Sequence, residues 1–138
     1  MDLTQRILTG DCRLIFLEGP SGSGKTALLR RLPPEKTDFL SMEAYREGMI
    51  AALRAGAENP IGDFLTALLE QHPKEVLCLE DVDLELQGKF STQVSFARQL
   101  QELARSRRVV VTGIRLDQRC PELFTALDPA GYEYYQLV

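Results

Sequence analysis

The hydrophobic positions of the chain form short continuous runs separated by longer amphipathic stretches. This alternation is expected when helices cover both faces of a mostly parallel sheet, because the central strands of such a sheet are buried on both sides. The fold class predicted is α/β, a three-layer α/β/α sandwich around a mostly parallel five-stranded sheet. The predicted strands are 14–17, 38–40, 76–79, 109–111 and a closing edge strand over 132–138.

The stretches between these strands carry apolar side chains three and four positions apart, which is the helical period. Within the longest stretch, Phe96, Leu100 and Leu103 fall on one face. Glycine and proline mark the ends of several of these segments. Helices are predicted over 25–32, 42–55, 61–71, 91–106 and 121–127. With 138 residues and no repeat or linker, one domain over 1–138 is expected.

The charge balance limits the classes of partner. A formal net charge of −4 argues against a surface built to hold a phosphate backbone, which requires an excess of Lys and Arg. Arg105, Arg107 and Arg108 form a local basic cluster, interpreted as the solvated end of a helix. Direct binding of nucleic acid by this chain alone is not expected.

Targeting signals and paired cysteines are also lacking. The first ten residues have no secretory apolar core, and no apolar stretch approaches the ~20 residues of a membrane span. Cys12, Cys78 and Cys120 are odd in number and far apart, which favours a reducing compartment over a disulfide framework or a zinc site. A cytoplasmic protein without membrane contact is predicted, with Cys78 buried and no role for His72.

The most specific motif lies between the first predicted strand and the first predicted helix. It matches G-x-x-x-x-G-K-[ST], the phosphate-binding loop of nucleoside triphosphatases. A polyphosphate must be wrapped by several backbone N–H groups, and this requires the unusual dihedrals that Gly19, Gly22 and Gly24 permit. The predicted nucleotide-contacting residues are Gly19, Pro20, Ser21, Gly22, Ser23, Gly24, Lys25, Thr26 and Ala27.

Two side chains of this loop have individual roles in the prediction. Lys25 is expected to contact the β and γ phosphates, and the Thr26 hydroxyl to bind Mg²⁺, while the following helix directs its positive pole at the anion. The predicted cofactors are ATP, or ADP, with Mg²⁺. The alternative is a glycine-rich turn without a ligand.

A pair of acidic residues ends the second strong apolar run. Glu80 and Asp81 are expected at the end of a strand beside the first one, where one would hold Mg²⁺ or its water and the other would polarise the attacking water. The alternative is a solvated acidic turn that includes Asp83 and Glu85. Both acids are therefore candidate metal ligands, with Thr26, and candidate catalytic residues, with Lys25.

The third strong run ends in Thr112 and Gly113. The Thr112 hydroxyl is a candidate catalytic group that contacts the γ phosphate or the attacking water. Capping of the strand or a turn explains this threonine equally well. Two interpretations of Arg115 stay open, a contact with phosphate and a cation exposed on the surface.

The order of these segments resembles the AAA+ ATPases, in particular the bacterial replication initiator DnaA and its shorter regulatory relative Hda. Besides the phosphate loop, the segments 39–41 and 51–56 look like the family's second strand and helix. The segment 77–82 looks like its acidic strand and 111–115 like its sensor strand. The resemblance runs from about Leu14 to Val138 and implies an AAA+ type core without the helical lid domain or a helix-turn-helix DNA reader.

The departures from the family concern hydrolysis. The family usually has Asp first in the acidic pair, whereas Glu80 stands first here. Its arginine finger would fall near 125–128, and no arginine follows Arg119. An arginine finger can contribute several powers of ten in rate, so a weak or partner-dependent Mg²⁺-dependent ATPase is expected.

The function implied is a nucleotide-controlled switch that associates with a protein partner or with further copies of itself, in DNA replication or its regulation. The alternatives are a non-catalytic nucleotide-binding scaffold and, less favoured, a small phosphotransferase. The latter would need an acceptor site and a mobile lid.

Overall fold

All five predicted strands are present, and they form one parallel sheet in the order β2-β3-β4-β1-β5. The parallel α/β prediction is therefore confirmed. The computed structural model describes residues 2–20, 22, 24–82 and 90–137. The strands are β1 (Leu14–Glu18), β2 (Thr37–Ser41), β3 (Val76–Glu80), β4 (Arg108–Gly113) and β5 (Tyr132–Gln136).

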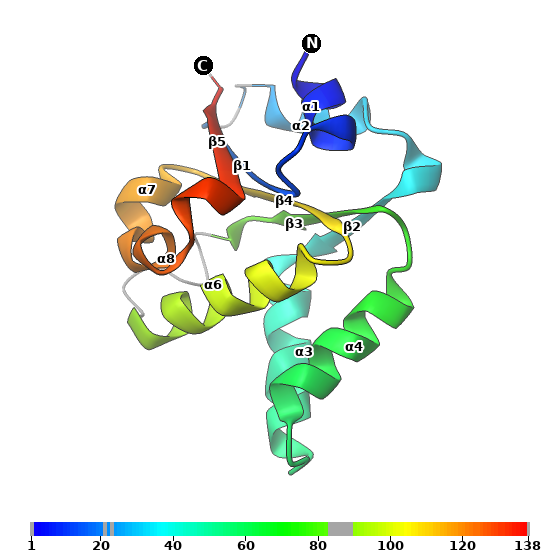
Figure 1. Cartoon of the computed structure of the whole chain (residues 1–138), viewed down its shortest axis with the longest axis vertical. Coiled ribbons are helices and arrows are strands. Elements are labelled where there is room, and N and C mark those ends of the chain that lie inside the picture. Colours follow the sequence, from blue (N-terminus) through cyan, green and yellow to red (C-terminus); the bar gives the residue numbers. More distant parts are fainter. Residues whose placement is uncertain (1, 21, 23, 83–89, 138) are drawn as a thin grey trace.

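Seven α-helices surround this sheet within the described residues, and Figure 1 shows them in two layers with the sheet between. The helices α1 and α2 cover one face, and the others gather on the opposite face. Their bounds are α1 (Leu3–Thr9), α2 (Lys25–Arg30), α3 (Met42–Arg54), α4 (Pro60–Gln71), α6 (Phe90–Leu103), α7 (Leu116–Arg119) and α8 (Pro121–Ala126). Two short 3₁₀ turns, Pro34–Lys36 and Pro129–Gly131, precede β2 and β5.

Several boundaries differ from the prediction. α2 ends at Arg30, because Arg31 and Leu32 close a tighter turn with bonds to carbonyls three residues back. α6 ends at Leu103 for the same reason, since the Arg105 and Ser106 N–H groups also bond three residues back. α1 and α7 were not predicted at all. β5 ends at Gln136.

The strands separate two hydrophobic clusters because alternate side chains point to opposite faces. On the α1 and α2 face, Ile7 and Leu29 pack with Ile15, Cys78 and Val110. The opposite face buries a larger set from the remaining helices, including Phe16, Leu77, Leu79, Val109 and Val111. By this alternation, Glu80 and Thr112 point to the α2 face, and Glu18 points to the other face.

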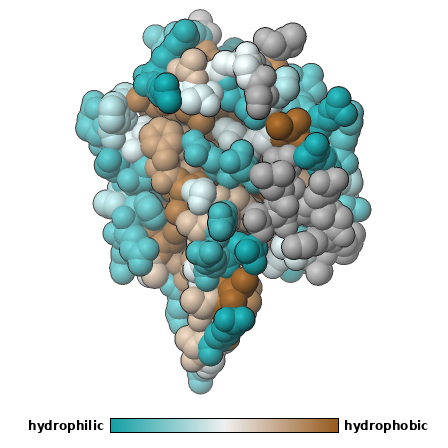
Figure 2. All heavy atoms as spheres, turned by 180° about the vertical axis from the view of Figure 1, so that it is seen from behind, coloured by the Kyte–Doolittle hydropathy of each residue, from teal (hydrophilic) through white to brown (hydrophobic). Residues whose placement is uncertain are grey.

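The α3–α4 pair extends away from the sheet and gives the molecule its tapered end (Figure 1). Seen from behind, apolar side chains form a band between hydrophilic flanks that reaches this tapered end (Figure 2). Phe39, 45% exposed, and Leu53, 52% exposed, are the large apolar residues most open to solvent among the described residues. No described helix combines the length and apolar character that crossing a membrane requires.

Thiol labelling is expected to separate Cys12 from the other two cysteines. Cys78 and Cys120 are fully buried, and burial, with a smaller contribution from Glu80, raises the pKa of Cys78 to about 12. Cys12 is partly exposed, with a pKa raised by its partial burial and then by Glu133. We expect a disulfide reagent at about pH 9 to label Cys12 alone in the folded chain and all three thiols in denaturant. Rapid labelling of a second thiol in the folded chain would contradict this packing.

Candidate functional site

The phosphate loop follows β1 and adopts the left-handed backbone that its motif predicts. Gly22 has φ 85° and Gly24 has φ 96°, a region that L side chains enter only with strain. A Cβ at either position would meet nothing within 4 Å, so the dihedral angle, and not crowding, accounts for these two glycines. Gly19 has no positive φ, so the same expectation was wrong for it. Ser21 and Ser23 lie outside the described residues.

The loop is held against the end of β4. The Gly113 carbonyl accepts a hydrogen bond from the Gly19 N–H at 3.2 Å and another from Lys25 Nζ at 3.2 Å. Lys25 is partly buried, whereas Pro20, Thr26 and Ala27 are exposed. Because an ammonium group has three donors, Lys25 retains donors for a further acceptor.

The first turn of α2 supplies free backbone donors. The Leu28 N–H makes the first intrahelical bond, to the Gly24 carbonyl, at 2.8 Å. The N–H groups of Lys25, Thr26 and Ala27 therefore have no partner within the helix and can bind an anion. α2 has only six residues, so these individual N–H groups matter more than the dipole of the helix.

The acidic pair lies at the same edge of the sheet, but not on the strand next to β1. β4 separates β3 from β1, so the expectation of a strand directly beside the first one was wrong. Glu80 ends β3 and is half-buried on the α2 face. Asp81 is exposed and has φ 61°, a backbone that aspartate tolerates better than most residues. Asp83 and Glu85 lie outside the described residues.

Thr112 occupies the strand between the loop and the acids. It is 5% exposed and shares the α2 face with Glu80. Leu79 pairs with Val111. The next residues along these two parallel strands, Glu80 and Thr112, therefore lie beside each other at this edge of the sheet. The structure thus brings the ends of β1, β3 and β4 together. Arg115 lies two residues beyond β4, exposed, with φ 51° at the start of α7.

The available ligands suit a hard cation that also takes oxygens from phosphate and water. Within the described ranges, no three His, Cys, Asp or Glu side chains come together as a metal cluster. A hydroxyl from Thr26 and a carboxylate from Glu80 or Asp81 are the oxygen donors typical of Mg²⁺ sites. This donor set fits Mg²⁺ better than a softer metal such as Zn²⁺, which prefers nitrogen and sulfur.

Sequence reasoning missed two residues next to the loop, Glu18 and Tyr134. Glu18 directly precedes Gly19 and is 8% exposed. The Tyr134 hydroxyl on β5 is hydrogen-bonded to Glu18, and it accepts the Asp117 N–H at 3.3 Å. Burial and then the bond to Glu18 raise the pKa of Tyr134. In the sequence, the one signal for Glu18 was its position as a carboxylate at the end of an apolar run. His72 is the C-cap of α4.

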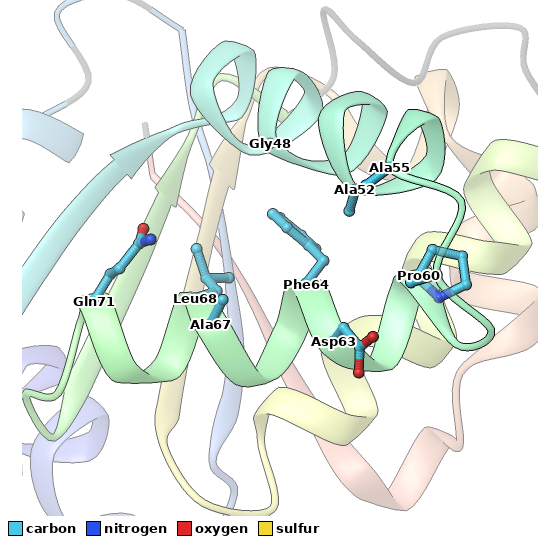
Figure 3. A pocket seen from close by; sticks show the side chains of 10 residues that line it. Gly48, Ala52, Ala55, Pro60, Asp63, Phe64, Ala67, Leu68 and Gln71 are labelled. Carbon is cyan, nitrogen blue, oxygen red and sulfur yellow. The ribbon is translucent and has the colours of Figure 1, made fainter.

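A separate hollow of about 400 Å³ lies between α3 and α4. Figure 3 shows Phe64 directed from α4 toward α3. A Cβ at Gly48 would lie 2.7 Å from this ring, so glycine permits the close approach of the two helices. Asp63 is the one charged residue in the lining, and without a cation the hollow does not suit a triphosphate. The candidate site therefore remains at the phosphate loop.

Comparison with solved structures places this geometry in a known fold. Domain III of the Thermotoga maritima replication initiation protein DnaA gives a TM-score of 0.67 at 21% sequence identity, over 98% of this chain and 60% of that chain. Replication initiator DnaA bound to AMPPCP and single-stranded DNA gives 0.60 at 20% identity, over 96% and 43% of the two chains. AMPPCP-bound DnaA from Aquifex aeolicus gives 0.55 at 21% identity, over 89% and 39%.

This chain thus spans between 39% and 60% of the length of those three structures. No protein-family model and no curated protein matches the sequence. The likeness is in the fold, and it extends over nearly the whole of this chain. The chain therefore has the fold of the AAA+ core of DnaA.

Proposed function

We propose that the chain binds ATP, with Mg²⁺, at the phosphate loop. The observation that carries the proposal is the left-handed Gly24, which leads directly into α2 and leaves the N–H groups of Lys25, Thr26 and Ala27 without helical partners. A backbone of this kind, beside a partly buried lysine, is suited to a polyphosphate. That two of the similar DnaA structures contain AMPPCP supports the proposal.

Each site residue has a role in this proposal. Lys25 contacts the β and γ phosphates, and Thr26 holds Mg²⁺ together with Glu80 or Asp81. Bound Mg²⁺ would neutralise phosphate charge. The remaining acid and Thr112 orient the attacking water at the edge between β3 and β4. Arg115 is assigned no contact, because it is exposed and begins a separate helix.

The activity proposed is slow or partner-dependent hydrolysis that serves a switch. No arginine follows Arg119, so this chain has no cation in the region 120–138 to stabilise the transferred charge. A protein partner or a second copy would provide it. The similarity to DnaA structures supports a role in DNA replication or its regulation, and the three cysteines, none of them in a disulfide, support the cytoplasm.

Binding and hydrolysis are measured separately to test this function. We expect calorimetric titration with ATP and Mg²⁺ to show saturable binding, and phosphate release by the isolated chain to be slow. Asp81→Asn should bind ATP with an affinity within about threefold of the wild type and release phosphate at least about tenfold more slowly. Absence of saturable binding in the wild type would show that the proposal is wrong. Binding with no release above the Asp81→Asn rate would favour the non-catalytic scaffold.

A further inference from the structure

The carboxylate of Glu18 is buried next to the phosphate loop, on the face of the sheet opposite α2. Burial of a carboxylate is costly unless hydrogen bonds compensate for the lost water. The Tyr134 hydroxyl donates such a bond to it. The backbone on either side is also fixed, because the Glu18 carbonyl accepts the Leu137 N–H at 2.7 Å and the Gly19 N–H bonds to Gly113.

The same hydroxyl reaches a third segment of the chain. It accepts the Asp117 N–H, which lies in the first turn of α7 and has no partner within that helix. The N-cap of α7 is Arg115, whose φ of 51° is unfavourable for an arginine and persists only where its surroundings hold it. Tyr134 therefore lies between the base of the phosphate loop and a strained helix start.

The phosphate loop is also bonded to the end of β4, the strand that leads to α7. Lys25 donates to the Gly113 carbonyl in this structure, two residues before Arg115. Because the ammonium group has further donors, Lys25 can bond a phosphate and the Gly113 carbonyl together, so it would link a bound phosphate to the end of β4. Beyond α7, α8 is attached to α6 by the Glu122 N–H, which donates to Gln93 at 3.1 Å.

We propose that Tyr134 is a positioning residue that couples occupancy of the phosphate loop to the placement of α7, through Glu18 on one side and the Asp117 N–H on the other. This inference rests on the proposed function, because it requires nucleotide at the loop. It gives the switch an output surface, formed by α7 and by α8 beyond it. Arg115, Asp117 and Gln118 are exposed there.

Tyr134→Phe tests the coupling, and Tyr132→Phe is the matched control. Both tyrosines lie on β5, are half-buried, and pack against Phe16 and Phe124. Within the ranges that the structure describes, the Tyr132 hydroxyl makes no hydrogen bond. Each substitution keeps the ring and removes one hydroxyl, so a loss of packing should affect both variants alike.

Amide hydrogen exchange at Asp117 is the measurement, first without nucleotide and then with ATP and Mg²⁺. In the nucleotide-free protein, we expect Tyr134→Phe to raise this exchange rate about tenfold and Tyr132→Phe to leave it unchanged. With ATP, we expect the wild type and Tyr132→Phe to change their rate at Asp117, and Tyr134→Phe to lose most of that change.

The outcomes separate this inference from the function on which it rests. Equal exchange at Asp117 in Tyr134→Phe and the wild type would overturn the positioning role. Binding of ATP by the wild type without any change at Asp117 would overturn the coupling alone. Failure of the wild type to bind ATP would overturn the proposed function and the coupling with it, while the nucleotide-free comparison would still report on the Tyr134 hydrogen bond.

Discussion

Lys25→Ala is expected to weaken ATP binding by about 10- to 150-fold, since hydrogen bonds to charged groups contribute about 1.5–3 kcal/mol. Lys25 is the one cation within the phosphate loop, so its loss leaves the β and γ phosphates to the backbone N–H groups and Mg²⁺. The fold should survive, because the Gly113 carbonyl keeps its bond from the Gly19 N–H. Calorimetric titration of the two proteins with ATP at one fixed salt concentration measures the change.

Lys36→Ala is the control for this loss of charge. Lys36 is exposed and directly precedes β2. Because the strands are parallel, the start of β2 lies at the edge of the sheet opposite the phosphate loop. This variant should bind ATP with wild-type affinity. If both substitutions weakened binding equally, the effect would reflect net charge, and the role given to Lys25 would be wrong.

Phe16→Ala is expected to have the largest effect on stability, a loss of about 3–5 kcal/mol. Phe16 is fully buried at the centre of β1, and its ring centroid lies 4.8 Å from that of Phe124 and 5.5 Å from that of Tyr132. Total stabilities are about 5–15 kcal/mol, so this one substitution removes a large fraction and can unfold the chain. Equilibrium unfolding in urea, followed by circular dichroism, gives the difference.

Phe39→Ala provides the comparison within the same chain. It deletes the same side chain from the edge strand β2, where Phe39 is 45% exposed. We expect a cost of about 1 kcal/mol or less, because the site is open and leaves no cavity. A cost equal to that of Phe16→Ala would mean that Phe39 on β2 makes a contact that this structure does not contain. Should Phe16→Ala not fold, Phe16→Leu gives a smaller loss of the same sign.

Much of the sheet could be predicted because three of its strands are buried on both faces. Runs such as Leu14–Leu17 leave no polar position for an amphipathic helix, and Gly19 and Pro20 end the first of them. The backbone of the phosphate loop was also predictable, because its motif places glycines where the chain needs dihedrals that other residues enter only with strain. The left-handed Gly22 and Gly24 agree with that reading.

The order of the strands could not be predicted in the same way. The segments that form β3 and β4 are equally apolar, so the sequence does not indicate which of the two strands lies next to β1. The acidic pair was therefore placed on the wrong neighbour. Glu18 was missed because its meaning depends on Tyr134, more than a hundred residues later in the sequence.

The two unpredicted helices were missed for different reasons. α1 had usable signals, since the Asp2 side chain accepts the Gln5 N–H and Leu3 and Ile7 are four residues apart. α7 had none, because it is four residues long and follows an N-cap arginine in a left-handed conformation. Tertiary contacts around Leu116 and Cys120, both fully buried, determine that helix.

The position of β1 in the sheet has a consequence for synthesis of the chain. Both of its neighbours, β4 and β5, come from the last third of the sequence, whereas β2 and β3 pair with each other much earlier. As the ribosome releases the chain, β1 and the phosphate loop have no strand to pair with until residues 108–113 emerge. Non-local parallel pairing of this kind forms slowly and leaves apolar strands open to aggregation. Nascent chains that stop before β4 should therefore depend on chaperones and be unable to hold a nucleotide.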